Sequence, residues 1–264
     1  MLTAAKNQFK VTIISIKYAL IKETLNKATF ISNNIFMILN NASFLFQWIV
    51  LYAIKDSIGG YAFKEILLLW GLAASTYGIS RAIFASSFDL ADTINQGKLD
   101  AFLVQPKSVL LSVITTKSKS SAIGDVIFGY LTLIIYGINL QKFLLFNLFS
   151  ITGAIIITSF AVILGSLSFW ISKSDIIADS ANEIVTCFAT YPDGIFKNGA
   201  KIILFTIIPI GIANYIPIKV ILDFNLTKLL IILGGTTVFI ILATLIFNTG
   251  LKKYSSGNLM SARV

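Results

Sequence analysis

The sequence predicts an all-α integral membrane protein with six transmembrane helices. Hydrophobic residues make up 56% of the 264 residues, whereas Asp, Glu, Lys and Arg together make up only 12%. A typical soluble domain carries about 25% charged residues and could not bury this much apolar surface. The same composition excludes intrinsic disorder. The few charges also leave long uncharged stretches between them, which is the pattern of membrane-spanning helices.

Three of these stretches are long enough to cross the apolar core of a bilayer, which takes about 20 residues of helix. Each stretch is bounded by lysines and contains no charged residue. They predict transmembrane helices over about residues 31–54, 144–172 and 229–251.

Two further stretches predict spans although they contain charged residues. In residues 63–86 the charges lie near the ends, where long side chains reach the lipid headgroups. Residues 118–139 carry Asp125 near their start. We expect Asp125 to pair with Lys119 or Arg81, because an unpaired carboxylate at membrane depth is costly.

The stretch before the last predicted span is too short for an ordinary transmembrane helix. Lys201 and Lys219 enclose only 17 uncharged residues, and Pro209 and Pro217 interrupt them. Proline removes a backbone donor and breaks the helical hydrogen-bond ladder. Short proline-broken apolar segments suit re-entrant hairpins that are held inside protein. We therefore expect a re-entrant region over residues 199–224.

An acidic stripe lies just before this region. Asp175, Asp179 and Glu183 recur every four residues and therefore fall on one face of a helix. The pattern favours a fifth span over residues 175–195, with its acidic face turned to the bundle interior. Alternatively, this segment is a cytoplasmic amphipathic helix and residues 202–222 are the fifth full span. Both interpretations leave six spans.

The distribution of basic residues predicts the orientation. Residues 3–28 precede the first span and suit a helix that lies in the membrane interface with its lysines extended to the headgroups. Cytoplasmic loops are enriched in Lys and Arg. With the N-terminus inside, the larger share of the 21 Lys and Arg residues lies on the cytoplasmic side. We expect a multi-pass protein of the cell (cytoplasmic) membrane with both termini in the cytoplasm. The net charge of +9 then favours contact with membrane lipids and no nucleic acid.

The longest polar stretch lies between the second and third predicted spans. Its residues 87–108 suit a short helical run that Gly97 interrupts and Pro106 ends. Such a short run cannot stand alone. It docks either on helix ends of the same chain or on a cytoplasmic partner. Acidic residues mark its start and apolar residues one of its faces: Asp89, Asp92, Leu99, Phe102 and Leu103.

Three segments of the chain form a recognisable set. The loop fits the pattern I-x-x-G-x-L-D-x-x-L-x-x-P through Ile94, Gly97, Leu99, Asp100, Leu103 and Pro106. A later passage carries Pro192, Phe196, Pro209 and Pro217, and the ending GLKKYSSGN carries Gly250, Tyr254, Gly257 and Asn258. In this order, and with six predicted spans, the set resembles the bacterial ABC transporter permeases of the type-2 exporter class.

The resemblance implies one transmembrane permease domain over residues 1–264. In it an interfacial elbow helix precedes the six spans, and external re-entrant helices lie between spans five and six. The loop between spans two and three would carry a coupling helix that fits a groove on a separate ABC ATPase subunit. A second permease subunit, the same or a different chain, would complete the transporter. The implied coupling-loop residues are Asp89, Asp92, Ile94, Gly97, Leu99, Asp100, Leu103 and Pro106, and those of the re-entrant turn are Pro209 and Pro217.

The chain itself lacks the residues that ATP hydrolysis needs. The segment from Gly194 to Lys201 is similar to a phosphate-binding loop, but Ala200 displaces its lysine and Ile202 replaces its Ser or Thr. The sequence contains no histidine, which excludes histidine-based catalysis and histidine metal sites. We expect no catalytic residue, metal or bound cofactor in this chain, and ATP and Mg²⁺ on the partner ATPase.

Polar residues at membrane depth are candidates for a translocation path. Intramembrane acids are usually functional, which points to Glu183 and Asp179, and the first span adds Asn41. Alternatively, Asp179 lies at a helix start, where the helix dipole favours it. Asn41 alternatively forms a hydrogen bond to a neighbouring helix.

The sequence thus predicts the membrane-spanning subunit of an ATP-driven exporter and not an enzyme. One alternative is an ion-gradient-driven secondary transporter or channel without an ATPase. Such proteins usually carry broken helices at matching positions in two halves, and the first half of this chain contains no proline-broken counterpart. Another alternative, a membrane enzyme that acts on lipid, would have few catalytic groups.

Overall fold

The computed structural model describes residues 2–171 and 174–255. Gly257 and Asn258 of the C-terminal pattern, and the last residue of the predicted 144–172 span, lie outside the described residues. Within the described part the chain folds into helices and no β-strand. The helices are α1 (Leu2–Thr24), α2 (Lys27–Ile54), α3 (Phe63–Phe84), α4 (Leu90–Asn95), α5 (Asp100–Leu103), α6 (Val109–Ile114), α7 (Ala122–Tyr136), α8 (Leu140–Ser166), α9 (Asp175–Ala189), α10 (Asn198–Thr206), α11 (Ile216–Leu222) and α12 (Leu226–Leu251).

Four helical stretches among the described residues are long and apolar enough to cross a membrane. They are α2, the continuous stretch Phe63–Asn95, the stretch Leu140–Phe169 and α12. A fifth candidate is a pair of helical segments bent by 79° at the break that contains Pro209. The helices α7 and α9 have 15 residues each, which gives about 22 Å of length, less than the roughly 30 Å apolar core. The six-span layout stays a prediction.

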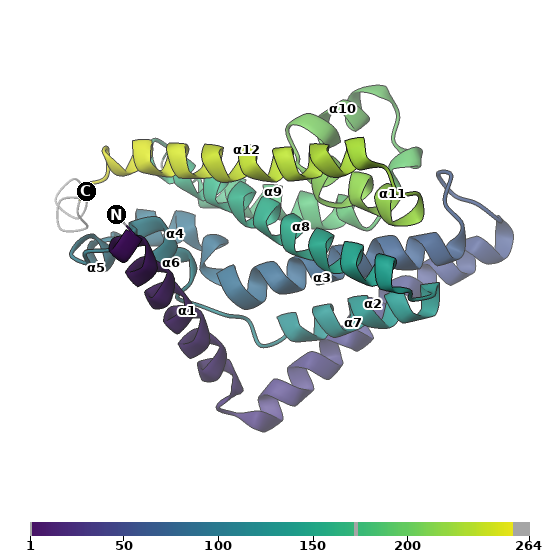
Figure 1. Ribbon diagram of the computed structural model, residues 1–264, viewed down its shortest axis with the longest axis horizontal. Coiled ribbons are helices and arrows are strands. Elements are labelled where there is room, and N and C mark those ends of the chain that lie inside the picture. Colours follow the sequence, from purple (N-terminus) through teal and green to yellow (C-terminus); the bar gives the residue numbers. More distant parts are fainter. Residues whose placement is uncertain (1, 172–173, 256–264) are drawn as a thin grey trace.

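The helices α3 and α8 form the centre of the molecule, whereas α2 and α12 are mostly exposed. Figure 1 shows α12 running along α8, and α1 leaving α2 as the second arm of a V. The start of α1, the short helices α4 to α6 and the end of α12 lie together; we call this the loop end. The turn between α2 and α3 lies with α10 and α11 at the opposite end, which we call the hairpin end.

The closest helix packing joins α3 and α7. A side chain at Gly71 of α3 would overlap the hydroxyl of Thr132, and one at Gly129 of α7 would overlap the hydroxyl of Ser75. Small residues therefore let the two backbones approach, which is how membrane helices gain dispersion energy without a hydrophobic driving force. Thr132 turns its hydroxyl back to the carbonyl oxygen of Gly129, at 2.7 Å. The close approach at Gly71 and Gly129 places α3 directly beside α7.

Asparagine residues begin three of the long helices. The first N–H groups of a helix have no partner within it, and a side-chain oxygen at the N-cap position supplies one. The side-chain oxygens of Asn26, Asn139 and Asn225 accept hydrogen bonds from the backbone of α2, α8 and α12. These caps determine where the spans start.

The bent pair closes over the end of α9. The side-chain amide of Asn214 donates to the carbonyl oxygen of Ala189 at 2.6 Å, and the hydroxyl of Tyr215 donates to that of Phe188 at 2.6 Å. Both acceptors are carbonyls of the last turn of α9, which the helix itself leaves without partners. Pro209 and Pro217 are buried on either side of this contact. The bend thus provides the groups that end α9.

A buried carboxylate holds the hairpin end together. Asp193, beyond the end of α9, has a side chain only 3% exposed. It accepts hydrogen bonds from the hydroxyl of Tyr61 at 2.7 Å and the ammonium of Lys219 at 2.6 Å, and Lys201 lies at 3.5 Å. Burial alone would raise the pKa of Asp193, but these hydrogen bonds and charges outweigh it and hold the pKa below its usual range. We call these four residues the Asp193 cluster.

Replacing Asp193 by Asn should lower the free energy of unfolding by about 2 kcal/mol, because hydrogen bonds to a charged group are lost at a buried site. A depressed pKa in the folded state gives stability that is present above the unfolded pKa, about 3.9, and is lost as the pH falls below it. Thermal unfolding in detergent from pH 7 to 3 measures both effects. The exposed Asp56→Asn variant is the control, and equal melting temperatures for the two variants at pH 7 would contradict the prediction.

Candidate functional site

The predicted coupling loop lies at the loop end and docks on helices of its own chain. Leu90 and Ile94 of α4 and the following Leu99 are fully buried. They pack with Val162 of α8 and Phe247 of α12 in one apolar cluster. A side chain at position 165 would overlap Leu90, so a glycine there lets α4 approach α8 closely. The docking on the same chain, one of the two expected alternatives, therefore accounts for this part of the loop.

The tip of the loop is not covered by the chain. Leu103 is 43% exposed, Val104 is 84% exposed and Pro106 is also exposed. None of the four residues of α5 is fully buried, although Phe102 packs partly against the apolar cluster. The loop thus has a docked base and an open apolar tip.

Gly97 turns the chain between base and tip. Its φ is +69°, a left-handed conformation that glycine adopts without strain. The backbone N–H of Gly97 donates to the carbonyl oxygen of Ile94, and the N–H of Lys98 donates to that of Thr93, which is how a glycine after a helix satisfies its last carbonyls. The predicted interruption at Gly97 is therefore a helix end that reverses the chain into α5.

Polar contacts attach the loop to its surroundings. Lys117 forms an ion pair with Asp89 at 2.6 Å, and because both side chains are about half exposed it adds little stability. Asp92 is exposed. The helix α1 reaches the same region: Ser15 donates to the carbonyl oxygen of Thr115 at 2.9 Å, and Gln8 accepts from the N–H of Ser108 at 2.9 Å.

The end of α12 also contacts the loop. The hydroxyl of Tyr254 donates to Asp100 Oδ1 at 3.0 Å. Burial and this hydrogen bond to a carboxylate raise the pKa of Tyr254 to about 12, so the hydroxyl keeps its proton at physiological pH. Two residues of the sequence patterns, 154 positions apart, thus meet in the fold.

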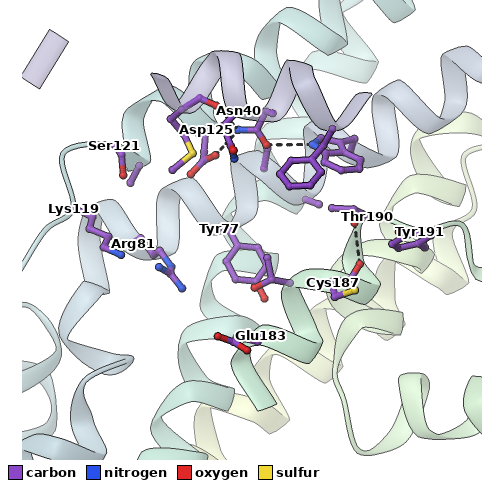
Figure 2. A pocket seen from close by; sticks show the side chains of 18 of the residues that line it. Asn40, Tyr77, Arg81, Lys119, Ser121, Asp125, Glu183, Cys187, Thr190 and Tyr191 are labelled. Carbon is purple, nitrogen blue, oxygen red and sulfur yellow. Dashed lines mark hydrogen bonds between the residues drawn. The ribbon is translucent and has the colours of Figure 1, made fainter. Parts of the chain in front are cut away.

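A second feature is a pocket of about 580 Å³ between α2, α3, α7 and α9 (Figure 2), which we call the α3 pocket. Its wall combines aromatic and polar side chains, including Trp70 and Tyr77 of α3. Asn41 of α2 joins two other elements here: its amide donates to Asp125 Oδ1 at 2.7 Å, and its oxygen accepts from the indole N–H of Trp70 at 3.2 Å. The alternative that Asn41 bonds neighbouring helices is therefore confirmed.

The expected ion pair of Asp125 is wrong. Lys119 and Arg81 line the α3 pocket near Asp125, but neither is in an ion pair with it among the described residues, and Asn41 supplies its hydrogen bond instead. Arg81 lies over the ring of Phe88, 4.8 Å from the centroid. Because Phe88 lies between α3 and α4, this stacking turns the guanidinium of Arg81 toward the loop end. The sequence pattern did not reveal this pocket, because its walls come from four separate helices.

The structure separates the predicted translocation residues. Glu183 and Asn41 both line the α3 pocket, and Glu183 is exposed toward it (Figure 2). Asp179 does not line it. The helix α9 contacts α4, and the charges of Asp92, Asp175, Asp89 and Glu183 act on Asp179. The acidic stripe therefore divides between pocket and loop end.

Comparison with known proteins identifies a family for nearly the whole chain. The family model described as ABC-2 family transporter protein matches residues 11–257. No curated protein and no solved structure gives a significant match to the chain. Within the residues that the structure describes, no group of three or more His, Cys, Asp or Glu side chains could hold a metal ion.

Replacing Asn41 by Leu should destabilise the fold by about 1–3 kcal/mol, because the buried indole N–H of Trp70 and the Asp125 carboxylate both lose their partner. The matched control is Asn40→Leu, since Asn40 lines the same pocket, is exposed and makes no side-chain hydrogen bond with the described residues. Thermal unfolding in detergent compares the two variants. A melting temperature of Asn41→Leu at or above that of Asn40→Leu would count against the hydrogen-bonded role of Asn41.

Proposed function

The chain belongs to the ABC-2 family of transporter proteins, and we propose that it is the permease subunit of an exporter driven by a separate ATP-binding-cassette ATPase. The family match covers nearly the whole chain, so it applies to the entire fold and not to one segment of it. The observation that carries the proposal is the loop at the loop end: its base is packed against α8 and α12, while its apolar tip is exposed.

The loop end faces the cytoplasm in this proposal. Lysines gather there on either side of the short helices, and cytoplasmic loops are enriched in such residues. The hairpin end, with its bent pair, then faces outward. The lysines that support this orientation are Lys98, Lys107, Lys117, Lys119, Lys252 and Lys253.

The exposed tip is the contact for the ATPase subunit. An isolated apolar tip in water is unfavourable, and a groove on a partner that covers Leu103 and Val104 removes this surface from solvent. The acids beside the loop, Asp92 and Asp179, favour a partner surface with basic residues around that groove. ATP and Mg²⁺ bind to this partner.

The helix α3 passes movement from the loop to the α3 pocket. A 3-10 turn over Ala85–Ser87 and two turn residues form the short connection from α3 to α4, so a displacement of α4 reaches α3 through this connection. The pocket is lined along α3 by Trp70, Tyr77 and Arg81, over roughly 16 Å of the helix axis. ATP-driven closure of the ATPase subunits moves the loop, and the different affinities of the two resulting states for substrate and ATP couple them.

A second permease subunit covers the open side of the α3 pocket. Glu183, Cys187 and Asn40 are exposed there, and in this proposal they lie at the depth of the membrane. Polar side chains in contact with acyl chains are costly, whereas a protein surface or a water-filled cavity between two permeases accommodates them. Substrate crosses the membrane through the cavity between the two permeases. This cavity opens first to one side of the membrane and then to the other.

Replacing Val104 by Asp should abolish copurification with the ATPase subunit, because a charge replaces an apolar contact worth about 1.5–3 kcal/mol and the affinity falls at least about tenfold. Lys98→Ala is the matched control, an exposed residue of the same loop outside the tip. The measurement is affinity purification from native membranes in mild detergent, with ATPase activity assayed. Equal recovery of the ATPase with both variants would show that the tip is not part of the interface.

The same purification with the wild-type chain tests the proposed function itself. A stoichiometric soluble subunit with a phosphate-binding loop should copurify with it. Recovery of the permease alone, although the ATPase is present in the lysate, would favour the ion-gradient-driven transporter instead.

A further inference from the structure

The hydrogen bond between Tyr254 and Asp100 joins the predicted coupling loop to the end of the last long helix. Asp100 begins α5, next to the exposed tip, and Tyr254 follows α12 by three residues. The distance from the hydroxyl oxygen of Tyr254 to Asp100 Oδ1 is 3.0 Å. Along the chain the two residues are 154 positions apart, and the helices α6 to α12 lie between them.

The ring of Tyr254 is anchored on the side of the spans. It packs edge-on against Phe169, with 6.2 Å between centroids, and Phe169 packs edge-on against Phe247 of α12 at 5.6 Å. A side chain at Gly250 would overlap the ring of Phe169, so a glycine there allows this contact. Phe169, just beyond the end of α8, therefore holds the Tyr254 ring and is itself packed against α12.

The helix α5 is weakly held by comparison. It has four residues, none of which is fully buried, and a helix of this length has no stability of its own. Its base is fixed by the buried Leu99 before it, but its orientation needs a further contact. The carboxylate of Asp100 makes that contact with an aromatic residue that the spans already hold.

We propose that Tyr254 is a positioning residue that fixes α5, and with it the exposed tip, relative to α12 through Asp100. The inference rests on the proposed function, in which the ATPase moves this tip. With the hydrogen bond in place, α5 and α12 move as one unit, and movement of the tip reaches the last span as well as α3. Without it, the tip can move while α12 stays in place.

The test measures the distance between α5 and α12 in the complex of permease and ATPase. Cys187 is the one cysteine in the sequence, so Cys187→Ser gives a background free of cysteine. Ala101→Cys on α5 and Val238→Cys on α12, both exposed, carry spin labels. Distance distributions are recorded without nucleotide and with ATP and vanadate.

We expect one narrow distance that nucleotide leaves unchanged when Tyr254 is present. Tyr254→Phe keeps the ring and loses the donor, and should broaden the distribution and make it shift with ATP and vanadate. Tyr18→Phe, an exposed tyrosine on α1, is the matched control and should behave as the parent. Asp100→Asn keeps an acceptor oxygen and should retain more of the narrow distance than Asp100→Leu.

The outcomes separate this inference from the function on which it rests. If the parent chain binds the ATPase and Tyr254→Phe keeps one narrow, unshifted distance, the positioning role is wrong and the exporter proposal stands. If the parent chain binds no ATPase, the exporter proposal fails. In that case broadening in Tyr254→Phe without nucleotide still supports the contact, and an unchanged distribution overturns it. A drop in melting temperature without broadening likewise overturns the positioning role, since a contact for stability alone predicts it.

Discussion

The need to give polar groups a partner inside the protein shapes much of this structure. Lipid offers no hydrogen bonds, so a helix end or a polar side chain at membrane depth must be satisfied by the chain itself. Asparagine meets this need repeatedly, because one side chain offers both an acceptor and donors. Asn139 and Asn225 begin spans, Asn214 ends α9, and Asn41 joins Asp125 to Trp70. The boundaries of the spans and the shape of the α3 pocket both depend on these bonds.

Features that are local in the sequence could be predicted, and those that need distant partners could not. Gaps between charges located the long apolar helices, and the prolines located the bent pair, because both signals are read along the chain. Asparagine caps could have sharpened the helix starts: Asn225 precedes a helix, and its side chain accepts from the third residue on. The loop motif gave the turn at Gly97, since a glycine after a helix commonly adopts a positive φ.

The contacts that define the candidate site could not be predicted from local sequence patterns. Asp125 had two basic residues within reach, and the choice of Asn41 follows from how α2 crosses α7. The acidic stripe has the right helical spacing, yet only Glu183 faces the α3 pocket, because the position along α9 decides which carboxylate reaches it and which lies beside the loop. The docking of Ile94 and Leu99 on the same chain was one of two open alternatives, and the apolar surface of α8 and α12 decides it.

The two ends of the molecule are held by different forces, and this difference sets where movement occurs. The Asp193 cluster fixes the chain beside the start of α3 through charged hydrogen bonds, which are directional and weaken as their angles depart from the preferred geometry. The loop base is held by apolar packing, which is non-directional and tolerates small rotations of rigid helices. In the proposed transporter, a force on the tip would then turn α3 about the hairpin end. The displacement would be largest near Arg81 and smallest near Tyr61, so the α3 pocket would change most on the side of the loop.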